Sequence, residues 1–359
     1  MEDLGIDEKY PRSEHVRSLE DVAGSYTYFA EGDVLLAKIT PCFQNGKLGI
    51  AKNLKNGVGF GSSEFIVIRP SAELDREYVY YFLSREDFLA EGVLRMGGSV
   101  GQQRVPNEFV QGQLIPLPPL AEQRRIVGIL DEAFEGLATA KANAEQNLQN
   151  ARALFESHLQ AVFTQRGDGW VEHTLGDACE FVGGSQPPKS VFTKKKTADN
   201  VRLIQIRDYK SDKHVVFIPR SQARRFCTAD DVMIGRYGPP LFQILRGIDG
   251  AYNVALMKAV PNETKVSKDF LFYFLKHSAI LQYVIFHAQR AAGQIGVTKD
   301  TLEPYPIALP PLAAQTKVVK TIVELESAIE SLESLYQRKL AALDELKKSL
   351  LHRAFSGQL

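Results

Sequence analysis

Two long stretches of the chain carry hydrophobic residues at the spacing of long helices. From Ala313 to Ser356 neither Gly nor Pro interrupts the chain, and hydrophobic residues recur in alternating steps of three and four. This spacing is typical of a coiled-coil seam. Lys339 interrupts the register. The predicted seam positions are Ile322, Leu325, Ile329, Leu332, Tyr336, Leu343, Leu346 and Leu350.

The other stretch, from Ala121 to Phe163, is poorer in large hydrophobic residues. Each stretch follows a Leu-Pro-Pro-Leu corner, and Pro suits a first helical turn but cannot continue a helix from upstream. About 45 residues at ~1.5 Å each form a rod of about 65 Å. We therefore expect two long helices that pack on each other. The matching positions of the first helix are Leu137, Ala140, Ala144, Ala151 and Leu154.

The regions before the long helices have the pattern of mixed, β-rich domains. Short hydrophobic runs lie between Gly, Asn and Pro residues, which are strand and turn signals. A helical stretch follows in each region, Glu77–Leu94 and Lys268–Gln289, and then a Gly-rich loop, Gly97–Gly101 and Gly293–Gly296. The expected fold class is α+β. The predicted strands lie at residues 33–39, 64–68, 232–234 and 254–257.

The chain repeats itself. Ile115–Gln123 returns in closely related form at Ile307–Gln315, an offset of 192 (315 − 123), and the same offset pairs Phe163 with Phe355. This period is too long for a solenoid. It indicates a duplicated module, in which a mixed domain precedes a long helix. The predicted parts are a domain at 1–117, a helix at 118–165, a second domain at 166–309 and a second helix at 310–359.

Charge and composition narrow the range of functions. The chain has 43 Lys or Arg and 43 Asp or Glu, but residues 166–310 hold 20 basic and 14 acidic residues, an excess of six. That segment is a candidate for binding a polyanion. No run of about 18 hydrophobic residues predicts a membrane span. Three distant cysteines fit neither disulfides nor a metal site, so we expect a reducing cytoplasm.

Motifs of catalysis are missing from the sequence. It contains no phosphate-binding Gly-x-x-x-x-Gly-Lys-Ser/Thr loop and no His spacing typical of a metal site. Gly238-Pro239-Pro240-Leu241 lacks the Asn or Asp and the aromatic residue of an amino-methyltransferase motif. An enzyme such as a free-standing nuclease or methyltransferase is therefore not favoured.

In combination, the repeat and several local sequences resemble the specificity subunit of type I restriction–modification systems. Asp33–Phe43 with Asn45-Gly46-Lys47 is similar to part of a target recognition domain of that family. Trp170–Leu175 with Gly183–Pro188 is similar to the opening of the second such domain, and Leu350–Leu359 to the close of these subunits. The resemblance covers nearly the whole chain.

The resemblance implies a function in DNA recognition. Two target recognition domains, related by a pseudo-two-fold, would each read one half of a split sequence in double-stranded DNA. The two helices would pack antiparallel and set the spacing of the half-sites, about one DNA turn or ~34 Å. Two methyltransferase subunits would dock on the chain, and motor-nuclease subunits would join them. The chain itself would be non-catalytic and need no cofactor, because S-adenosylmethionine, ATP and magnesium serve the partners.

Loop residues with basic or amide side chains are the candidates for DNA contact, since such groups bind phosphates and base edges. Lys194, Lys195 and Lys196 form a charge run and are the strongest candidates for phosphate contacts. Gln102 and Gln294 occupy equivalent places in the repeat. The first-domain candidates are Lys38, Lys47, Ser62, Ser63, Gln102, Gln103 and Arg104. The second-domain candidates are Lys194, Lys195, Lys196, Arg236, Tyr237, Arg290 and Gln294.

Two further interpretations concern alternatives and completeness. A coiled-coil scaffold with duplicated domains for a protein ligand would also explain the neutral net charge. Separately, the second domain takes 35 residues (205 − 170) from Trp170 to Gln205, whereas the first begins near the equivalent of that strand. We therefore expect the first domain to lack the counterparts of Trp170, Leu175 and the Gly183–Pro188 loop. A missing opening strand would leave a sheet edge unpaired and hydrophobic surface uncovered.

Overall fold

The chain forms two compact units. The computed structural model describes residues 2–11, 15–22, 24–165, 167, 169–288 and 296–359. The first unit comprises Met1–Gln146 and Tyr336–Leu359, and the second comprises Asn147–Leu335. The long helices α5 (Leu120–Thr164) and α10 (Leu312–Phe355) each contribute one part to each unit.

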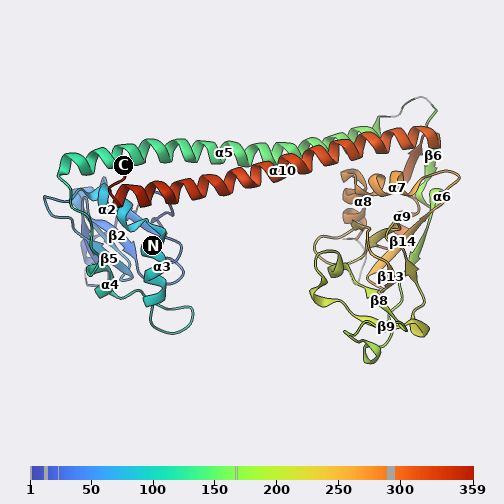
Figure 1. The fold of residues 1–359 in the computed structure, drawn as a ribbon, viewed down its shortest axis with the longest axis horizontal. Helices are drawn as coiled ribbons and strands as arrows, with labels where there is room; N and C mark the ends of the chain where they lie inside the picture. The colour runs from blue at the N-terminus through green and yellow to red at the C-terminus, as the bar shows by residue number, and fades with distance from the viewer. Residues whose placement is uncertain (1, 12–14, 23, 166, 168, 289–295) are drawn as a thin grey trace. The chain divides into compact units, whose positions relative to one another are not determined.

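In each unit the parts of α5 and α10 lie side by side and run antiparallel (Figure 1). In the first unit, Arg125 near the start of α5 donates to the carbonyl oxygen of Leu359 at 2.8 Å, and Lys141 pairs with Asp344 at 3.1 Å. In the second unit, Arg152 pairs with Glu333 at 2.6 Å. The prediction of two long, mutually packed helices in an α+β chain is confirmed.

The seam of α10 differs from the predicted one. Leu332 and Leu346 were expected to be buried, but their side chains are 40% and 47% exposed. Steps of four and three from the buried Ile322 lead instead through Glu326, Ile329 and Glu333 to Tyr336, Leu340, Leu343 and Lys347. The heptad pattern thus continues past Lys339 without a break. The hydrophobic pattern predicts the wrong seam positions here because each charged seam residue directly follows a leucine in the sequence. The pattern assigns that leucine to the seam in place of the charged residue.

The charged residues of this seam are all paired. Glu326 accepts from Lys276 Nζ at 2.8 Å, Glu333 from Arg152 at 2.6 Å, and Lys347 binds Asp7 at 2.5 Å. Burial alone would raise the pKa of Glu326, but hydrogen bonds from Lys276 and Tyr273 outweigh it and lower that pKa. The attraction within each pair offsets desolvation that an unpaired buried charge would bear without compensation.

The seam of α5 follows the prediction except at one position. Ala144 and Ala151 are buried, at 0% and 7% exposure, and Leu137 is half-buried. Leu154 is 58% exposed, so its predicted place in the seam is wrong. The neighbouring Phe155 takes that place and packs against the hydrophobic core of the second unit.

Ala144→Glu is expected to destabilise the first unit. Ala144 has no exposed surface, and a buried carboxylate without a partner costs on the order of several kcal/mol. The measurement is the hydrogen exchange of residues 120–146 at increasing denaturant concentration. Ala142→Glu is the matched control, because Ala142 on the same turn is exposed. Equal stability of the two variants would contradict a packed seam.

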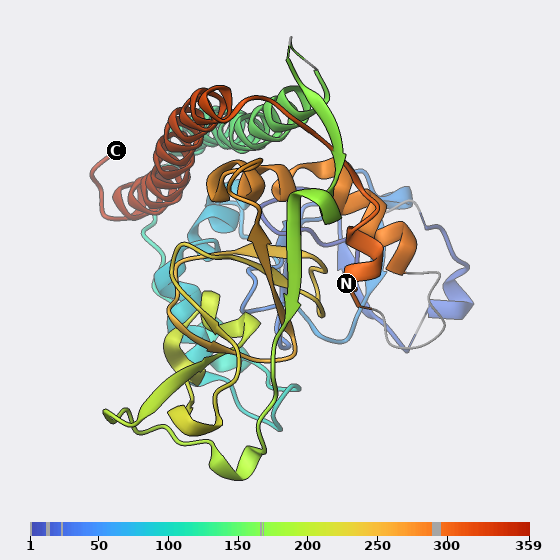
Figure 2. The same cartoon turned by 90° about the vertical axis from the view of Figure 1, so that its right-hand side faces the viewer.

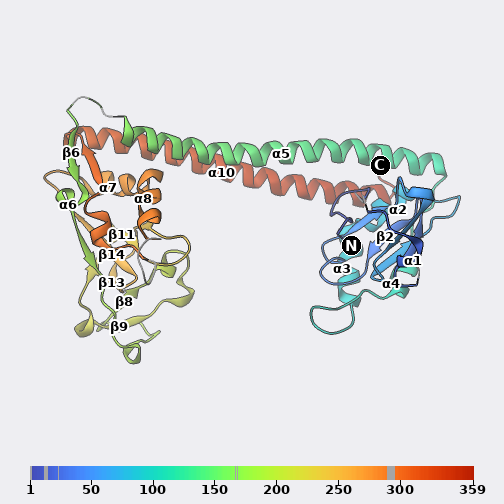
Figure 3. The ribbon, with the colours of Figure 1, turned by 180° about the vertical axis from the view of Figure 1, so that it is seen from behind.

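The first unit is built on a small antiparallel sheet with the order β3–β2–β5. Its strands are β2 (Val34–Ala37), β3 (Leu48–Ile50) and β5 (Phe65–Ile68), and every residue of β2 is buried. Helices α2 (Arg76–Leu83) and α3 (Glu86–Arg95) pack beside it (Figure 3). The remaining elements are α1 (Leu19–Val22), β1 (Thr27–Ala30), η1 (Lys55–Gly57), β4 (Val58–Gly61) and α4 (Asn107–Gln111), and β1 pairs with β4.

The described residues of the second unit form three sheets. The main sheet has the order β12–β11–β14–β7, the next β10–β13–β8–β9, and a two-stranded sheet joins β15 to β6 (Figure 2). The main-sheet strands are β7 (Cys179–Gly183), β11 (Val232–Gly235), β12 (Gln243–Leu245) and β14 (Leu256–Pro261). The others are β6 (Val171–Thr174), β8 (Asn200–Ile204), β9 (Phe217–Pro219), β10 (Phe226–Cys227), β13 (Gly250–Tyr252) and β15 (Pro306–Leu309).

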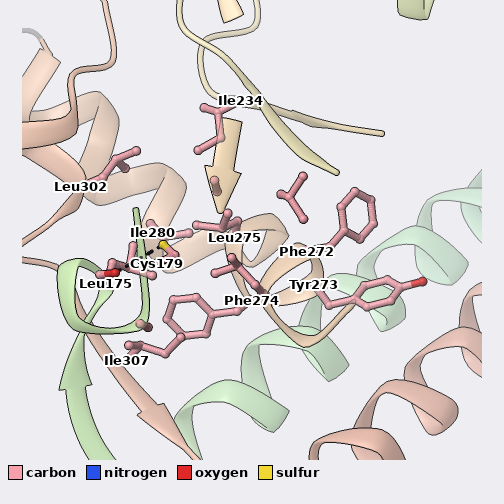
Figure 4. Packing of buried hydrophobic residues seen from close by; sticks show 14 of the residues in the cluster. Leu175, Cys179, Ile234, Phe272, Tyr273, Phe274, Leu275, Ile280, Leu302 and Ile307 are labelled. Atoms are coloured by element: carbon pink, nitrogen blue, oxygen red, sulfur yellow. Dashed lines mark hydrogen bonds between the residues drawn. The ribbon is translucent and has the colours of Figure 1, made fainter. Parts of the chain in front are cut away.

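The helices of the second unit enclose its core. They are α6 (Leu175–Ala178), α7 (Lys268–Lys276), α8 (Ser278–Ala288) and α9 (Lys299–Leu302), with short 3₁₀ turns η2 (Lys189–Val191), η3 (Ile206–Tyr209), η4 (Asp212–His214) and η5 (Arg220–Gln222). Figure 4 shows Phe274 and Leu275 of α7 packing among Ile280, Leu302 and Ile307. The thiol of Cys179 donates to the carbonyl oxygen of Leu175 at 3.3 Å.

Three predicted elements differ in extent. The stretch 77–94 is two helices, because Arg85 adopts extended backbone angles between α2 and α3. The stretch 268–289 is likewise broken at His277, which is extended between α7 and α8. The strand expected from residue 254 begins at Leu256, because a turn joins its amide to the carbonyl of Asn253. Hydrophobic spacing alone does not reveal single-residue breaks of this kind.

The two units repeat the same sheet register. Leu36 of β2 faces Ile66 of β5, and Ile234 of β11 faces Met257 of β14. The central strands correspond at an offset of 198 (234 − 36) and their neighbours at 191 (257 − 66). Every aligned pair between these strands keeps the same offsets. The duplication inferred from sequence is therefore present in the backbone.

A buried glutamine joins each domain to the helix that follows it. Gln123 Oε1 accepts from the Asp75 amide at 2.8 Å, and its Nε2 donates to the carbonyls of Glu73 and Pro118 at 2.9 and 2.8 Å. Gln315 makes the same three bonds, each partner shifted by 192 residues. Both side chains have 0% exposure. The Pro-Pro corners are thus fixed to their own domains. The Gln315 partners are Ser267, Lys265 and Pro310.

The far end of each long helix docks on the other copy of the module. Phe163 at the end of α5 lies 5.4 Å from the rings of both Phe270 and Phe274 in the second unit. Phe355 at the end of α10 lies 4.8 Å from the ring of Tyr78 and 5.4 Å from that of Phe82 in the first unit. All of these contacts repeat at the offset of 192. Each unit is therefore completed by residues from both halves of the sequence.

Candidate nucleic-acid interface

In the first unit, three predicted contact residues come together around Glu64. Arg104 donates two hydrogen bonds to the Glu64 carboxylate, at 2.9 and 2.8 Å. The amide of Lys38 donates to the Glu64 carbonyl at 2.9 Å, and Ser62 Oγ accepts from the Glu64 amide at 3.2 Å. The hydrogen bonds from Arg104 lower the pKa of Glu64. Arg104 is therefore held by a carboxylate that the sequence analysis did not consider.

The loop after Gly97 presents the amide side chains. The Gln103 amide donates to Thr40 Oγ1 at 3.1 Å, and the Thr40 amide donates to the Gln103 carbonyl at 2.9 Å. These bonds tie the loop to the end of β2. Gln102 and Ser63 are exposed, and Lys47 is half-buried beside β2. The first-unit candidates thus surround the carboxyl end of the central strand.

Arg236 of the second unit stands where Lys38 stands in the first. Lys38 follows β2 and Arg236 follows β11, and each carbonyl accepts from a valine amide, Val105 and Val297 respectively, at 2.9 and 3.0 Å. Arg236 Nε also donates to the Val297 carbonyl at 2.9 Å. The Tyr237 ring lies 5.2 Å from the Arg236 guanidinium.

The remaining second-unit candidates divide into two groups. Arg290 and Gln294 lie outside the described residues. Lys194, Lys195 and Lys196 are exposed in the loop between η2 and β8. Among the residues with described positions, no carboxylate lies within ion-pair distance of these three lysines. Their charges are available to an external anion.

The structure shows that this lysine run belongs to a larger basic segment. Residues 189–225 contain 11 Lys or Arg, 3 Asp and no Glu, an excess of eight positive charges (11 − 3). The segment includes β8 and β9, at the end of the second unit farthest from α10 (Figure 1). Charge counting over a shorter window would have found it. The exposed members beyond the lysine run include Arg207, Lys210, Lys213, Arg220, Arg224 and Arg225.

Two of the three acidic residues of this segment, Asp208 and Asp212, lie next to Arg202 of the same segment. Arg202 donates to Asp212 at 2.8 Å and lies 3.8 Å from Asp208. Burial raises the pKa of Asp208, although a backbone hydrogen bond and Arg202 oppose the shift. Asp208 is buried and Asp212 is exposed but paired with Arg202, so the exposed lysines and arginines of the segment do not have these carboxylates as partners.

In the part of the chain that the structure describes, no group of three or more His, Cys, Asp or Glu side chains is arranged to hold a metal ion. No described helix is both long and hydrophobic enough to cross a bilayer. The three cysteines are free, and burial raises the thiol pKa of Cys179 and Cys227 to about 12 and about 11.

Known proteins share this architecture. A chain from a solved structure on complex assembly and conformational transition of the type I R-M system superposes with a TM-score of 0.77, at 22% identity, over 94% of this chain and 85% of its own. The HsdS subunit from Thermoanaerobacter tengcongensis gives a TM-score of 0.61, at 23% identity, over 95% and 85%. At these identities the likeness shows the fold.

Sequence comparison identifies the family. The type I restriction enzyme EcoAI specificity subunit of Escherichia coli is 45% identical over 113 residues, which are 31% of this chain and 19% of that subunit. The aligned part is thus about a fifth of the relative's length. The family model described as type I restriction modification DNA specificity domain matches residues 10–149 and 167–338. The chain therefore belongs to the type I restriction–modification DNA specificity family.

Proposed function

We propose that the chain is the DNA-recognition subunit of a type I restriction–modification enzyme, with each unit reading one half of a bipartite target. The observation that carries this proposal is the duplication. Two domains share one sheet register, and each presents polar and basic residues beside the same strand end. A protein with two copies of one recognition domain suits a target with two half-sites.

Contacts with the DNA backbone and contacts with bases are assigned to different residues. The basic segment 189–225 supplies phosphate contacts, because its exposed lysines and arginines have no ion-pair partner among the described residues and phosphate binding needs positive charge. Lys38, Gln102 and Gln103 in the first unit, with Arg236 and Tyr237 in the second, are proposed to approach base edges. Arg104 serves there as a partner of Glu64, and the pair together can accept and donate hydrogen bonds.

Catalysis is proposed to reside in partner subunits. Two methyltransferase subunits would dock on the helices and domains, and motor-nuclease subunits would join them. S-adenosylmethionine, ATP and magnesium would be used by those partners and not by this chain. The exposed leucines of the long helices, such as Leu154 and Leu335 at 58% and 51% exposure, suit contact with a partner protein.

Replacing Lys194, Lys195 and Lys196 with Ala is expected to weaken binding to all DNA sequences alike. Each phosphate contact adds roughly 0.9 to the slope of log affinity against log salt concentration. Loss of three contacts should therefore flatten that slope by about 2 to 3. The measurement is a salt titration of DNA binding by the chain assembled with its methyltransferase partner.

A matched variant controls for the loss of three charges. Lys317, Arg338 and Lys339 are exposed on α10, outside the basic segment, and their replacement with Ala should leave the salt slope unchanged. A changed base preference with an unchanged slope in the lysine-run variant would contradict its role in phosphate binding.

A further inference from the structure

Arginines held by carboxylates lie at both ends of the central strand pair in the first unit. At the carboxyl end of β2, Arg104 donates to both carboxylate oxygens of Glu64, at 2.9 and 2.8 Å. At the amino end of β2, Arg69 donates to both carboxylate oxygens of Asp33, at 2.8 and 2.7 Å. The two ion pairs have the same chemistry but different counterparts in the second unit.

The pair at the amino end of β2 is repeated in kind. Asp33 corresponds to Asp231 at the offset of 198. Asp33 accepts from the Ala30 amide at 2.7 Å, and Asp231 accepts from the Thr228 amide at 2.9 Å. Asp231 also keeps a basic partner, since Lys258 Nζ lies 3.3 Å from its carboxylate. An ion pair that both copies of the module keep belongs to their shared fold.

The carboxylate at the carboxyl end of β2 is not repeated. Main-chain hydrogen bonds place Ala255 of the second unit where Glu64 stands in the first. Each of their carbonyls accepts from the residue that follows the central strand, Lys38 or Arg236, at 2.9 Å. The methyl side chain of Ala255 cannot bind an arginine, so the shared fold does not require a carboxylate at this position.

The arginine of this pair is not repeated either. Gly296 is the counterpart of Arg104 at the offset of 192. A Cβ atom at Gly296 would lie 2.4 Å from the Tyr237 ring, so this ring takes the space that a side chain would need. The two units thus share a backbone here and differ in the groups that it carries. Such a difference suits a difference in what the two units recognise.

Arg104 is fixed in position before any ligand binds. Its main chain exchanges two hydrogen bonds with Gly97, at 2.8 and 3.0 Å, and its Nη1 donates to the Gln102 carbonyl at 2.9 Å. A guanidinium has five N–H groups, and the described contacts with Glu64 and Gln102 use three of them, which leaves one on each terminal nitrogen. The side chain is 44% exposed, so these two groups can reach a ligand with little further loss of conformational freedom.

The remaining N–H groups suit an uncharged ligand with two adjacent acceptors, because a planar guanidinium can bind both at once. Glu64 neutralises the charge of Arg104, and its carboxylate would repel the negative charge of a phosphate. The pair therefore favours a base edge over the DNA backbone. In the major groove, guanine alone among the four bases presents two acceptors, O6 and N7.

We propose that Arg104 reads a guanine in the first half of the DNA target by donating to its O6 and N7, and that Glu64 holds the guanidinium in place. Arg104 is then a specificity-determining residue and Glu64 a positioning residue. This inference rests on the proposed function in DNA recognition and adds the identity of one base. The second unit, with Ala255 and Gly296 at these positions, does not read its half-site in this way.

The test uses the full chain assembled with its methyltransferase partner. Selection from a randomised DNA pool should give a first element with guanine at one fixed position, and replacing that base pair should weaken binding about 5- to 150-fold. Substitution of 7-deazaguanine, which lacks the N7 acceptor, should also weaken binding. Arg104→Met removes the N–H groups and nearly keeps the length of the side chain, so it should abolish both effects and leave the second element unchanged.

Glu64→Gln separates a positioning role from a purely structural one. This variant keeps the size of the side chain but removes the charge that holds Arg104. Discrimination in favour of guanine should fall, whereas affinity for unrelated DNA should rise, because Arg104 then carries an uncompensated positive charge. A loss of stability alone would lower the affinity for all sequences together.

Arg125→Met is the matched control. Arg125 donates to both carboxylate oxygens of Glu122, each at 2.7 Å, and is 47% exposed, but it lies on α5 and not beside the strand end. Its replacement should leave the base preference and the effect of 7-deazaguanine unchanged. Retention of the second element by each variant shows that the chain remains folded and bound.

Three results would overturn this inference and leave the proposed function intact. The first is a two-part target whose first element requires no guanine. The second is a preference for guanine, or a sensitivity to 7-deazaguanine, that survives Arg104→Met. The third is uniformly weaker binding by Arg104→Met with a flatter salt slope, which would assign Arg104 to a phosphate. A wild-type complex that selects no two-part target would overturn the proposed function and this inference with it.

Discussion

Exchange of residues 170–309 for those of another family member is expected to change one half of the DNA target and leave the other half unaltered. The second unit carries its own sheet, core and basic segment, so recognition by that unit should move with it. Each mismatched base pair costs about 1–3 kcal/mol. A former half-site with three mismatches should then bind about a hundredfold more weakly or worse.

The structure sets the ends of the exchanged segment. β6 at residues 171–174 pairs with β15 at residues 306–309, and both must come from one parent to keep the ladder intact. The measurement is the methylation or binding pattern of the hybrid on a randomised DNA pool. A hybrid that changes both halves of the target, or neither, would contradict independent reading by two units.

Phe355→Ala is expected to destabilise the first unit, and Phe163→Ala the second. Both rings are buried, at 8% exposure each, against aromatic residues of α2 and α7 respectively. Truncation of a buried phenylalanine to alanine costs about 3–5 kcal/mol. Hydrogen exchange of α2 and α7 measures the effect in each unit. Faster exchange should appear in α2 for Phe355→Ala and in α7 for Phe163→Ala.

Leu346→Ala is the control for these variants. Leu346 is also a large hydrophobic residue of α10, but it is 47% exposed, and surface substitutions usually change stability by about 0.5 kcal/mol or less. If Phe355→Ala were as mild as Leu346→Ala, the docking of the helix end on α2 would not stabilise the first unit.

The long helices and the duplication could be predicted from sequence because both leave long-range regularities. The offset of 192 relates Gln123 to Gln315 and Phe163 to Phe355, and the structure gives each pair equivalent contacts. The exact seam could not be predicted. Glu333 lies in the seam and Leu332 outside it, because steps of four and three from Ile329 to Tyr336 pass through position 333, where an ion pair with Arg152 accommodates the carboxylate.

The candidate DNA contacts could be predicted only in part. Lys38 and Arg236 share a position relative to the central strand, at the offset of 198 that the sequence already gives for Val34 and Val232. The hydrogen bonds between Arg104 and Glu64 join residues that are 40 positions apart in the sequence. No local sequence pattern predicts such a contact. The basic segment 189–225 does not stand out when charge is counted over all of residues 166–310, because most of the 14 acidic residues of that range lie outside the segment.

Selection of bound sequences from a randomised DNA pool, with the chain assembled with its methyltransferase partner, tests the central claim most directly. The account predicts two short sequence elements separated by a gap of fixed length and free composition. The first element should depend on the first unit and the second on residues 170–309. A single continuous element, or bound DNA without sequence preference, would contradict the assignment of the chain as a bipartite DNA-recognition subunit.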